Sequence, residues 1–245
     1  MLKVEDVNKS YRQNGWFSQV RRQVLRHIGF EWRKGESLGI IGESGSGKST
    51  LGRLLLGIEK PDSGVIAFDG KPVSDRSSRR GAISAVFQDY TSSINPFFTV
   101  RQAILEPLRF AGKASESFDI GKLLRQVGLD ESYLPRYPHE LSGGEAQRVC
   151  IARAVSVEPQ CILLDEATSS LDGSVQMQVL ELLKRLRTAY GMGYIFITHD
   201  IQAAAYLCDR MMILRHGEIV EIIKTAELKH VQSPYARELL RKVIW

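Results

Sequence analysis

The sequence lacks long apolar runs and is poor in cysteine. No uncharged stretch approaches the roughly 18 to 20 residues that a helix needs to cross a bilayer. The first residues, Met1–Asp6, lack the apolar segment of a secretory signal. Cys150, Cys161 and Cys208 form no CxxC pair and lie in apolar stretches, which is typical of buried free thiols. We therefore expect a soluble, cytoplasmic chain without disulfides.

Clusters of basic residues are also few. The chain has 33 lysines and arginines against 28 acidic residues, a net charge of +5. Its densest basic groups are Arg21-Arg22 with Arg26, and Arg79-Arg80, and no aromatic residues lie between them. Nucleic-acid-binding surfaces concentrate such residues, whereas scattered charges usually form solvated faces. We expect no nucleic-acid partner.

Short apolar runs separated by polar turns are typical of strands. These runs are Leu25–Trp32, Ser37–Ile41, a further strand pair at Gly64–Phe68 and Ile83–Phe87, and then Cys161–Leu164, Tyr194–Thr198 and Met211–Leu214. Helical periodicity extends from about Thr99 to Val157, and again from Ser174 to Tyr190. The alternation predicts an α/β fold with a mostly parallel sheet covered by helices and with one helical insertion.

Residues 42–49 match the phosphate-binding pattern GxxxxGK[ST] without a gap, between a predicted strand and a predicted helix. Glycines allow backbone N–H groups to surround phosphate oxygens, and the helix N-terminus adds positive partial charge. Lys48 supplies a mobile cation, and Ser49 supplies a hydroxyl for Mg²⁺. The residues expected to contact Mg-ATP here are Gly42, Glu43, Ser44, Gly45, Ser46, Gly47, Lys48, Ser49 and Thr50.

Two carboxylates end the apolar run Cys161–Leu164. Alternation along a strand would direct Asp165 and Glu166 to different sides. We expect Asp165 to support the magnesium shell beside Ser49, and Glu166 to act near the γ-phosphate as the general base. Two acids after a strand are also common as helix-capping charges, so the assignment depends on the phosphate loop.

A second glycine-rich helix start, Leu141–Arg148 with the sequence LSGGEAQR, lies before Asp165. Its position relative to the phosphate loop and to Asp165 resembles the ATP-binding cassette (ABC) ATPases. The resemblance spans nearly the whole chain. It implies a P-loop NTPase with a mixed β core, an N-terminal antiparallel β subdomain and an inserted helical subdomain. The implied bounds are residues 1–97 and 158–245 for the core and 98–157 for the helical part, within one domain of residues 1–245.

The same resemblance assigns three further residues and one further segment. Tyr11 is similar to the aromatic residue that stacks on adenine, and Gln88 to the glutamine that completes the catalytic and magnesium site. His199 resembles the switch histidine, and Ser170-Leu171-Asp172 resembles the D-loop. Lys48, Gln88, Glu166 and His199 are thus the expected catalytic set, with Ser49, Gln88 and Asp165 toward magnesium.

In the family, two cassettes pack head to tail and close on ATP together. The resemblance implies that Ser142, Gly143 and Gly144 contact the nucleotide of the partner chain. Glu145 departs from the family pattern, in which glutamine is commonest at this position.

Several segments are similar to the importers of peptides and nickel. These are the insertion Asn14–Arg22, the post-glutamine segment Ser92–Pro96, Tyr137–Glu140 and the tail Ser233–Leu240. The stretches Arg148–Ala154 and Phe196–Asp200 are similar to the second ATPase subunit of nickel importers. This resemblance implies a heterodimer with a related ATPase subunit, two transmembrane permeases, an extracellular binding protein, and a peripheral place on the cytoplasmic face of the membrane.

The cargo stays open among nickel, a metal chelate and a peptide. A soluble ABC ATPase acting on DNA, the ribosome or cluster assembly is the alternative from another class, but the chain has neither long coiled coils nor a second cassette. An export cassette is a nearer alternative. A P-loop kinase does not account for the segment 141–148.

Overall fold

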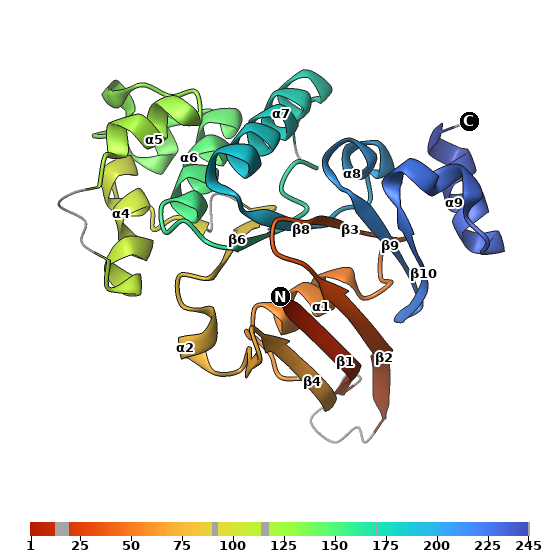
Figure 1. Cartoon of the computed structure of the whole chain (residues 1–245). Coiled ribbons are helices and arrows are strands. Elements are labelled where there is room, and N and C mark those ends of the chain that lie inside the picture. Colours follow the sequence, from red (N-terminus) through yellow and green to blue (C-terminus); the bar gives the residue numbers. More distant parts are fainter. Residues whose placement is uncertain (13–19, 90–92, 114–117, 170, 245) are drawn as a thin grey trace. The chain divides into compact units, whose positions relative to one another are not determined.

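The computed structural model describes residues 1–12, 20–89, 93–113, 118–169 and 171–244 (Figure 1). The chain forms two compact units. Unit 1 comprises Met1–Arg79 and Ile195–Trp245, and unit 2 comprises Arg80–Tyr194. Strand β8 (Gly193–Ile197) begins in unit 2 and ends in unit 1.

Unit 1 begins with an antiparallel sheet in the order β2-β1-β4-β5. Its strands are β1 (Leu2–Arg12), β2 (Arg21–Trp32), β4 (Ser63–Phe68) and β5 (Lys71–Pro72). Apolar side chains on one face are buried, as alternation in a half-buried sheet requires. At the end of the β1–β2 pair, Tyr11 lies directly opposite Arg22.

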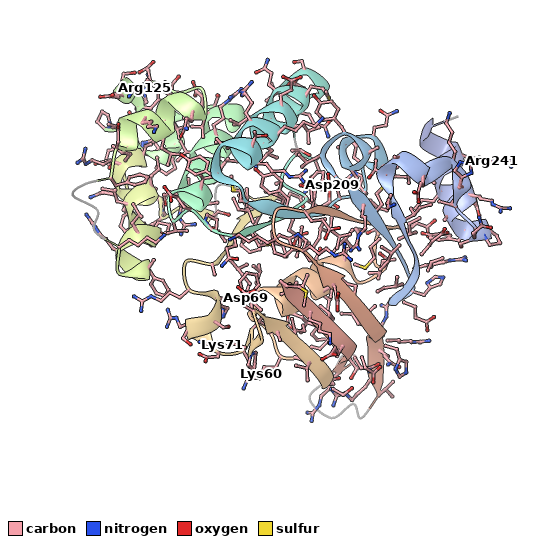
Figure 2. All side chains as sticks on the ribbon, in the orientation of Figure 1. Lys60, Asp69, Lys71, Arg125, Asp209 and Arg241 are labelled. Atoms are coloured by element: carbon pink, nitrogen blue, oxygen red, sulfur yellow. The ribbon has the colours of Figure 1, made fainter. Side chains whose placement is uncertain are left out.

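The second sheet of unit 1 has the order β10-β9-β3-β8. It contains β3 (Ser37–Ile41), which is buried throughout, β9 (Arg210–Arg215) and β10 (Glu218–Lys224). Strand β3 is parallel to β9, and β10 is antiparallel to β9, so the sheet is mixed. Asp209, labelled in Figure 2, accepts a hydrogen bond from the Ser37 amide (2.8 Å) and fixes the start of β3 beside β9.

Five helical elements complete the described part of unit 1. They are α1 (Lys48–Leu55), the short helix α2 (Arg76–Arg79), α8 (Ile201–Leu207), η3 (Thr225–His230) and α9 (Pro234–Ile244). Helix α8 packs on β3. Among the described residues, every helix of the chain is too short or too polar to span a bilayer.

Unit 2 has the strand order β8-β7-β6, with β6 (Ile83–Phe87) parallel to β7 (Cys161–Asp165). Its helical elements are α4 (Val100–Ala111), α5 (Ile120–Gln126), η1 (Glu131–Tyr133), η2 (Pro138–Glu140), α6 (Gly143–Val155) and α7 (Gly173–Tyr190). Helix α4 starts with a capping box in which Thr99 and Gln102 bond each other's backbone amides, and it ends at the left-handed Gly112. Helix α6 packs on α4, α5 and β6.

The predicted strands and the helical region all exist, with ends that differ by a few residues. The two strands predicted as a pair, Gly64–Phe68 and Ile83–Phe87, both exist but do not pair with each other. Strand β4 pairs with β1, and β6 pairs with β7. Strand partners depend on long-range packing, which a short apolar run does not encode. The cysteines are free and buried, as predicted. The predicted bounds at 97/98 and 157/158 stay a prediction.

Candidate nucleotide-binding site

The phosphate loop connects β3 to α1, both in unit 1, and it fits tightly against neighbouring backbone. A Cβ atom on Gly42 would lie 2.2 Å from the Leu214 carbonyl oxygen. A Cβ atom on Gly47 would lie 2.7 Å from Leu25 Cδ2, and Gly47 also has a φ of 106°, in the left-handed region. Only glycine meets both demands, so these two positions set the path of the loop.

Lys48 lies inside this loop. Its side chain is 7% exposed, and Nζ donates to the carbonyl oxygens of Gly42 (2.7 Å) and Glu43 (3.0 Å). On the other side of the loop, the Gly217 amide in the β9–β10 turn donates to the Ser46 carbonyl (3.0 Å). The loop therefore holds a buried ammonium group with the backbone wrapped around it, which is the charge that a polyphosphate requires.

Ser49 and Thr50 follow in the first turn of α1, where Ser49 is exposed and Thr50 is half-buried. Gly47 is the N-cap, and the Gly47 carbonyl accepts the first helical hydrogen bond from Leu51 (2.9 Å). The exposed Ser49 hydroxyl thus lies at the positive end of the helix, next to Lys48 in sequence.

Tyr11 is held by polar neighbours at the end of β1. Its hydroxyl donates to Glu59 Oε2 (2.6 Å), and Lys9 Nζ lies 5.2 Å from the ring centroid. Burial, followed by the hydrogen bond to Glu59, raises the pKa of Tyr11. The hydrogen bond from Tyr11 is in turn the main cause that lowers the pKa of Glu59. The phenol therefore stays neutral near pH 7, with its ring fixed in place.

His199 follows β8 and is exposed. Thr198 donates from its amide to the Ile40 carbonyl (3.2 Å), so the end of β8 lies beside the end of β3. Strand β3 leads into the phosphate loop, and Asp200 then caps α8 by accepting from Ala203 N (3.0 Å). Within unit 1, the fold thus brings His199 to the sheet edge from which the phosphate loop starts.

The described part of unit 2 gathers the polar residues of two parallel strands. Phe87 at the end of β6 is in register with Asp165 at the end of β7. Gln88 and Glu166 are the next residues in each chain segment. The carboxyl ends of parallel strands meet at one edge of a sheet, so Gln88, Asp165 and Glu166 lie at the same edge.

Glu166 corrects one step of the sequence argument. It has a φ of 53°, in the left-handed region, and β7 ends at Asp165. Strand alternation therefore does not set the direction of the Glu166 side chain, because the backbone has already left the strand. A non-glycine residue in this conformation is strained, and such residues concentrate at functional sites.

Ser142 is the N-cap of α6 and forms a capping box with Glu145. Glu145 Oε2 accepts from the Ser142 amide (2.7 Å), and Ser142 Oγ accepts from the Glu145 amide (3.4 Å). The other oxygen of Glu145 accepts from the Tyr133 hydroxyl (2.6 Å). The sequence analysis does not assign this role to Glu145, although Ser-x-x-Glu before a helix is a readable capping signal. Gly143 and Gly144 form the first turn of α6.

Asp172 caps α7. Its Oδ1 accepts from the amides of Ser174 (3.1 Å) and Val175 (3.0 Å). The hydrogen bond from the Val175 amide, followed by those from Ser174, holds the pKa of Asp172 below its usual range. Ser170 of the expected D-loop lies outside the described residues.

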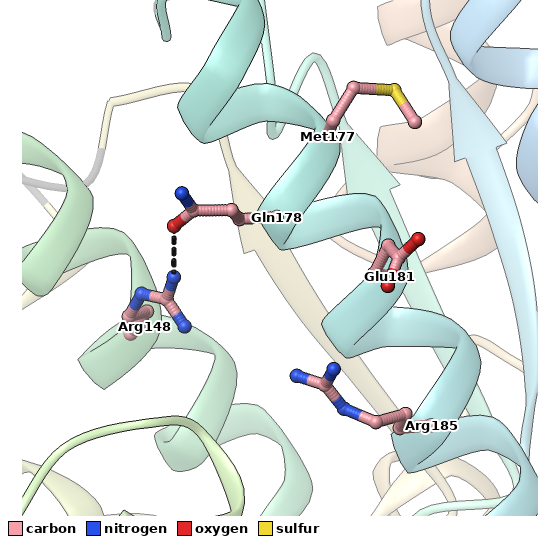
Figure 3. Close-up of a pocket in the computed structure, with 5 residues that line it drawn as sticks. All are labelled: Arg148, Met177, Gln178, Glu181 and Arg185. Atoms are coloured by element: carbon pink, nitrogen blue, oxygen red, sulfur yellow. Dashed lines mark hydrogen bonds between the residues drawn. The ribbon is translucent and has the colours of Figure 1, made fainter.

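Arg148, the last residue of the segment 141–148, ties α6 to two neighbours. It donates to the Val127 carbonyl at the end of α5 (2.9 Å) and to Gln178 Oε1 on α7 (3.0 Å). Figure 3 shows the hydrogen bond between Arg148 and Gln178, and the cavity at this place has a volume of about 400 Å³. The cavity is lined by Arg148, Met177, Gln178, Glu181 and Arg185. The N-terminal half of α6 is thereby fixed within unit 2.

Two segments used in the sequence comparison are described only in part. Residues 14–19 of the insertion and Ser92 of the post-glutamine segment lie outside the described residues. In the described remainder, Phe97 is 83% exposed, next to the segment that ends at Pro96.

Comparison with known proteins identifies the family. The model described as "ABC transporter" matches residues 25–169. The metal-staphylopine import system ATP-binding protein CntF of Staphylococcus aureus (strain NCTC 8325 / PS 47) is 49% identical over 245 residues, which cover 99% of this chain and 98% of the relative. The chain belongs to the ABC transporter family. Another member, the nickel import ATP-binding protein NikE of Rhodospirillum rubrum, is 40% identical, covering 100% of this chain and 91% of the relative.

Solved ABC structures agree in fold. The dimeric ATP-binding cassette MJ0796, in a post-hydrolysis state bound to ADP and Pi, has a TM-score of 0.81 at 30% identity, with 92% of this chain and 99% of that chain covered. The cbiO1 protein of Clostridium perfringens, part of the ABC transporter complex cbiONQ, has a TM-score of 0.79 at 29% identity, with 98% and 93% covered.

These similarities confirm the ABC resemblance, the predicted fold class and ATP as the nucleotide of the family. The chain is an ATP-binding cassette with the ATPase activity of a transport system. The roles of the individual site residues stay predictions.

Proposed function

We propose that the chain is the ATP-hydrolysing subunit of an importer that takes up a metal ion or a metal chelate across the cytoplasmic membrane. The observation that carries this proposal is its near-full-length similarity to two ATP-binding proteins named for metal import, at 49% and 40% identity. Both names concern metals, which favours nickel or a metal chelate over a peptide as the cargo.

The proposed reaction is hydrolysis of the bond between the β- and γ-phosphates of ATP. Lys48 and the loop amides neutralise phosphate charge, a role supported by the buried position of Nζ inside the loop. Glu166 orients a water molecule and accepts its proton as the water oxygen attacks the γ-phosphorus and ADP leaves. Such reactions depend mainly on positioning and charge stabilisation.

The residues present fit a magnesium ion. Ser49, Gln88 and Asp165 offer a hydroxyl, an amide oxygen and a carboxylate, the hard oxygen donors that Mg²⁺ prefers. Gln88 and Asp165 also share one sheet edge in unit 2. When bound there, the ion would add positive charge at the β- and γ-phosphate oxygens.

The remaining residues have proposed roles as well. Tyr11 stacks on adenine, His199 stabilises charge at the γ-phosphate, and Asp172 belongs to the contact with a second cassette. Ser142, with Gly143 and Gly144, seals the nucleotide of that second chain. A similar cassette, MJ0796, has been solved as a dimer bound to ADP and Pi, which supports such an arrangement.

We further propose that the second cassette is a related but different chain, and that the pair contacts two permeases that receive cargo from an extracellular binding protein. This assembly would place the chain peripherally on the cytoplasmic face of the membrane. Names of import systems on the relatives support a transport assembly of this kind.

The decisive substitution is Glu166→Gln, which keeps the size of the side chain and removes its basicity. We expect ATP turnover of the assembled complex to fall by roughly 10²- to 10⁴-fold, the usual contribution of a general base. Affinity for MgATP, measured by calorimetric titration, should stay within about twofold of the parent, because charge repulsion near the phosphates does not increase.

The matched control is Glu227→Gln, which changes an exposed acid of η3. It should leave turnover unchanged. Turnover at the parental rate in the Glu166→Gln complex would refute the assignment of the base.

A further inference from the structure

A cavity of about 600 Å³ lies beside the phosphate loop, entirely within unit 1. We call it the arginine pocket. Its lining residues are Arg21, Arg22, Gln23, Val24, Arg26, Gly45 and His216. A Cβ atom on Gly45 would meet nothing within 4 Å, so the loop backbone borders open space at this point. The pocket thus joins the first half of β2 to the middle of the phosphate loop.

The lining is basic. Three arginines and one histidine are among the lining residues, and the described lining residues include no carboxylate. Two of the arginines have acidic partners outside the lining: Arg21 pairs with Asp62 (3.1 Å), and Arg26 lies 3.7 Å from Glu218. These two ion pairs offset part of the positive charge, and the charge of Arg22 is left to attract an anionic ligand.

Arg22 differs from its two neighbours. Within the described ranges, its exposed guanidinium group makes no ion pair and no side-chain hydrogen bond, whereas Arg21 is also bonded to Ser10 Oγ (2.8 Å). Arg22 therefore keeps its five N–H donors for a ligand, in the planar fork that matches phosphate oxygens.

The strand register places Arg22 on the face where adenine is expected. Arg22 lies directly opposite Tyr11 in the antiparallel β1–β2 pair. Residues directly opposite in such a pair project to the same face of the sheet, with Cβ atoms about 5 Å apart. Arg22 thus shares a face with the ring proposed to stack on adenine and shares a cavity with Gly45 of the phosphate loop.

We propose that the arginine pocket is an anionic extension of the nucleotide site, in which Arg22 donates hydrogen bonds to phosphate oxygens of a nucleoside triphosphate. The proposal rests on the proposed function, because it takes ATP on residues 42–49 as given. Under this proposal, Arg21-Arg22 and Arg26 belong to a binding site and not to a solvated face. Arg22 is then a specificity residue that favours nucleotides with more phosphates.

The test is equilibrium binding of MgATP, MgADP and AMP to the full chain by competition with a fluorescent ATP analogue. We expect Arg22→Ala to weaken MgATP about 10-fold, MgADP less, and AMP least, since a charge-assisted contact to phosphate is removed. Arg22→Lys should recover part of the loss, because it restores the charge but not the fork. Raising the salt concentration should shrink the difference between Arg22→Ala and the parent.

Two controls separate the possible outcomes. Arg33→Ala removes an exposed arginine outside the pocket and should change no affinity. Lys48→Ala should lose MgATP binding; if it does not, the proposed nucleotide site itself fails. If the parent binds MgATP and Lys48→Ala does not, yet Arg22→Ala binds all three nucleotides as the parent does, only the arginine pocket proposal is overturned. An equal loss of affinity for all three nucleotides would also overturn it. So would a variant that changes only pairing with a second cassette and leaves every nucleotide affinity unchanged.

Discussion

Glu145 takes part in three hydrogen bonds at the start of α6. Its Oε2 accepts from the Ser142 amide, its own amide donates to Ser142 Oγ, and its Oε1 accepts from the Tyr133 hydroxyl. The hydrogen bond from Tyr133 is the main cause that lowers the pKa of the Glu145 carboxyl, and donors at Ser142 act in the same direction. A carboxylate in place of the commonest glutamine is thus satisfied by local donors. Its charge does not require a contact with nucleotide.

This arrangement predicts a pH dependence. Because the pKa of Glu145 is lower in the folded chain, its stabilising contribution is complete above the ordinary value of about 4.5 and is lost as the pH falls through the folded value. Glu145→Gln keeps the shape of the box but does not titrate. In urea unfolding, the parent should therefore lose more stability than Glu145→Gln between pH 7 and pH 4. Parallel losses in the two proteins would contradict this.

A second variant tests the box itself. Glu145→Ala removes the carboxylate that accepts from the Ser142 amide and from the Tyr133 hydroxyl, and leaves the backbone bond to Ser142 Oγ in place. It should lower the free energy of unfolding by about 1 kcal/mol at pH 7, a magnitude similar to that of a helix cap. Glu140→Ala would be a poor control because Glu140 bonds the Tyr137 amide in a similar way (2.7 Å). Glu181→Ala, in the middle of α7, is the matched control.

At the scale of the elements, Arg148 connects α6 to α5 and to α7. The guanidinium group bonds the Val127 carbonyl, which ends α5, and the Gln178 amide oxygen on α7 (Figure 3). We expect Arg148→Ala to lower the free energy of unfolding by about 1 to 2 kcal/mol, because a carbonyl loses its charged donor. Chemical denaturation measures this change. Arg185→Ala, on the same cavity but without these contacts, should have less effect, and an equal effect would refute the role of Arg148.

Elements with a purely local signal could be predicted from the sequence. Strand β3 and the phosphate loop are an example, since the short apolar run Leu38–Ile41 and the spacing of the glycines after it are both visible in the sequence. Strand β10 (Glu218–Lys224) was missed because charged residues interrupt its apolar pattern. The partners of β4 and β6 were wrong for a different reason, because sheet pairing is decided by packing between distant segments.

The candidate site shows the same division. Lys48 and Asp165 follow from motif spacing, but the contact of Lys48 with the Gly42 and Glu43 carbonyls does not, since it depends on the folded path of the loop. Arg22 could not be distinguished from its basic neighbours in the sequence. Its register with Tyr11 and its place beside Gly45 become visible only once β1 and β2 pair.

For the whole molecule, the main expectation concerns its companions. When a tagged chain is recovered from membranes in mild detergent, a different ATPase subunit and two permeases should come with it, as the similarity to import ATPases indicates. Mass spectrometry identifies the companions. Recovery of ribosomal or DNA-bound proteins in place of permeases would contradict an import role. A parallel preparation with an unrelated tagged ATPase gives the background.

The left-handed backbone at Glu166 has one more implication. Glycine, free of a Cβ atom, would relieve the local steric conflict there at no cost in space to the turn that follows β7. The proposed role of Glu166 as general base would account for an acid in this strained backbone position. Substitutions that replace left-handed residues by glycine to raise the thermal stability of this cassette should therefore leave Glu166 unchanged.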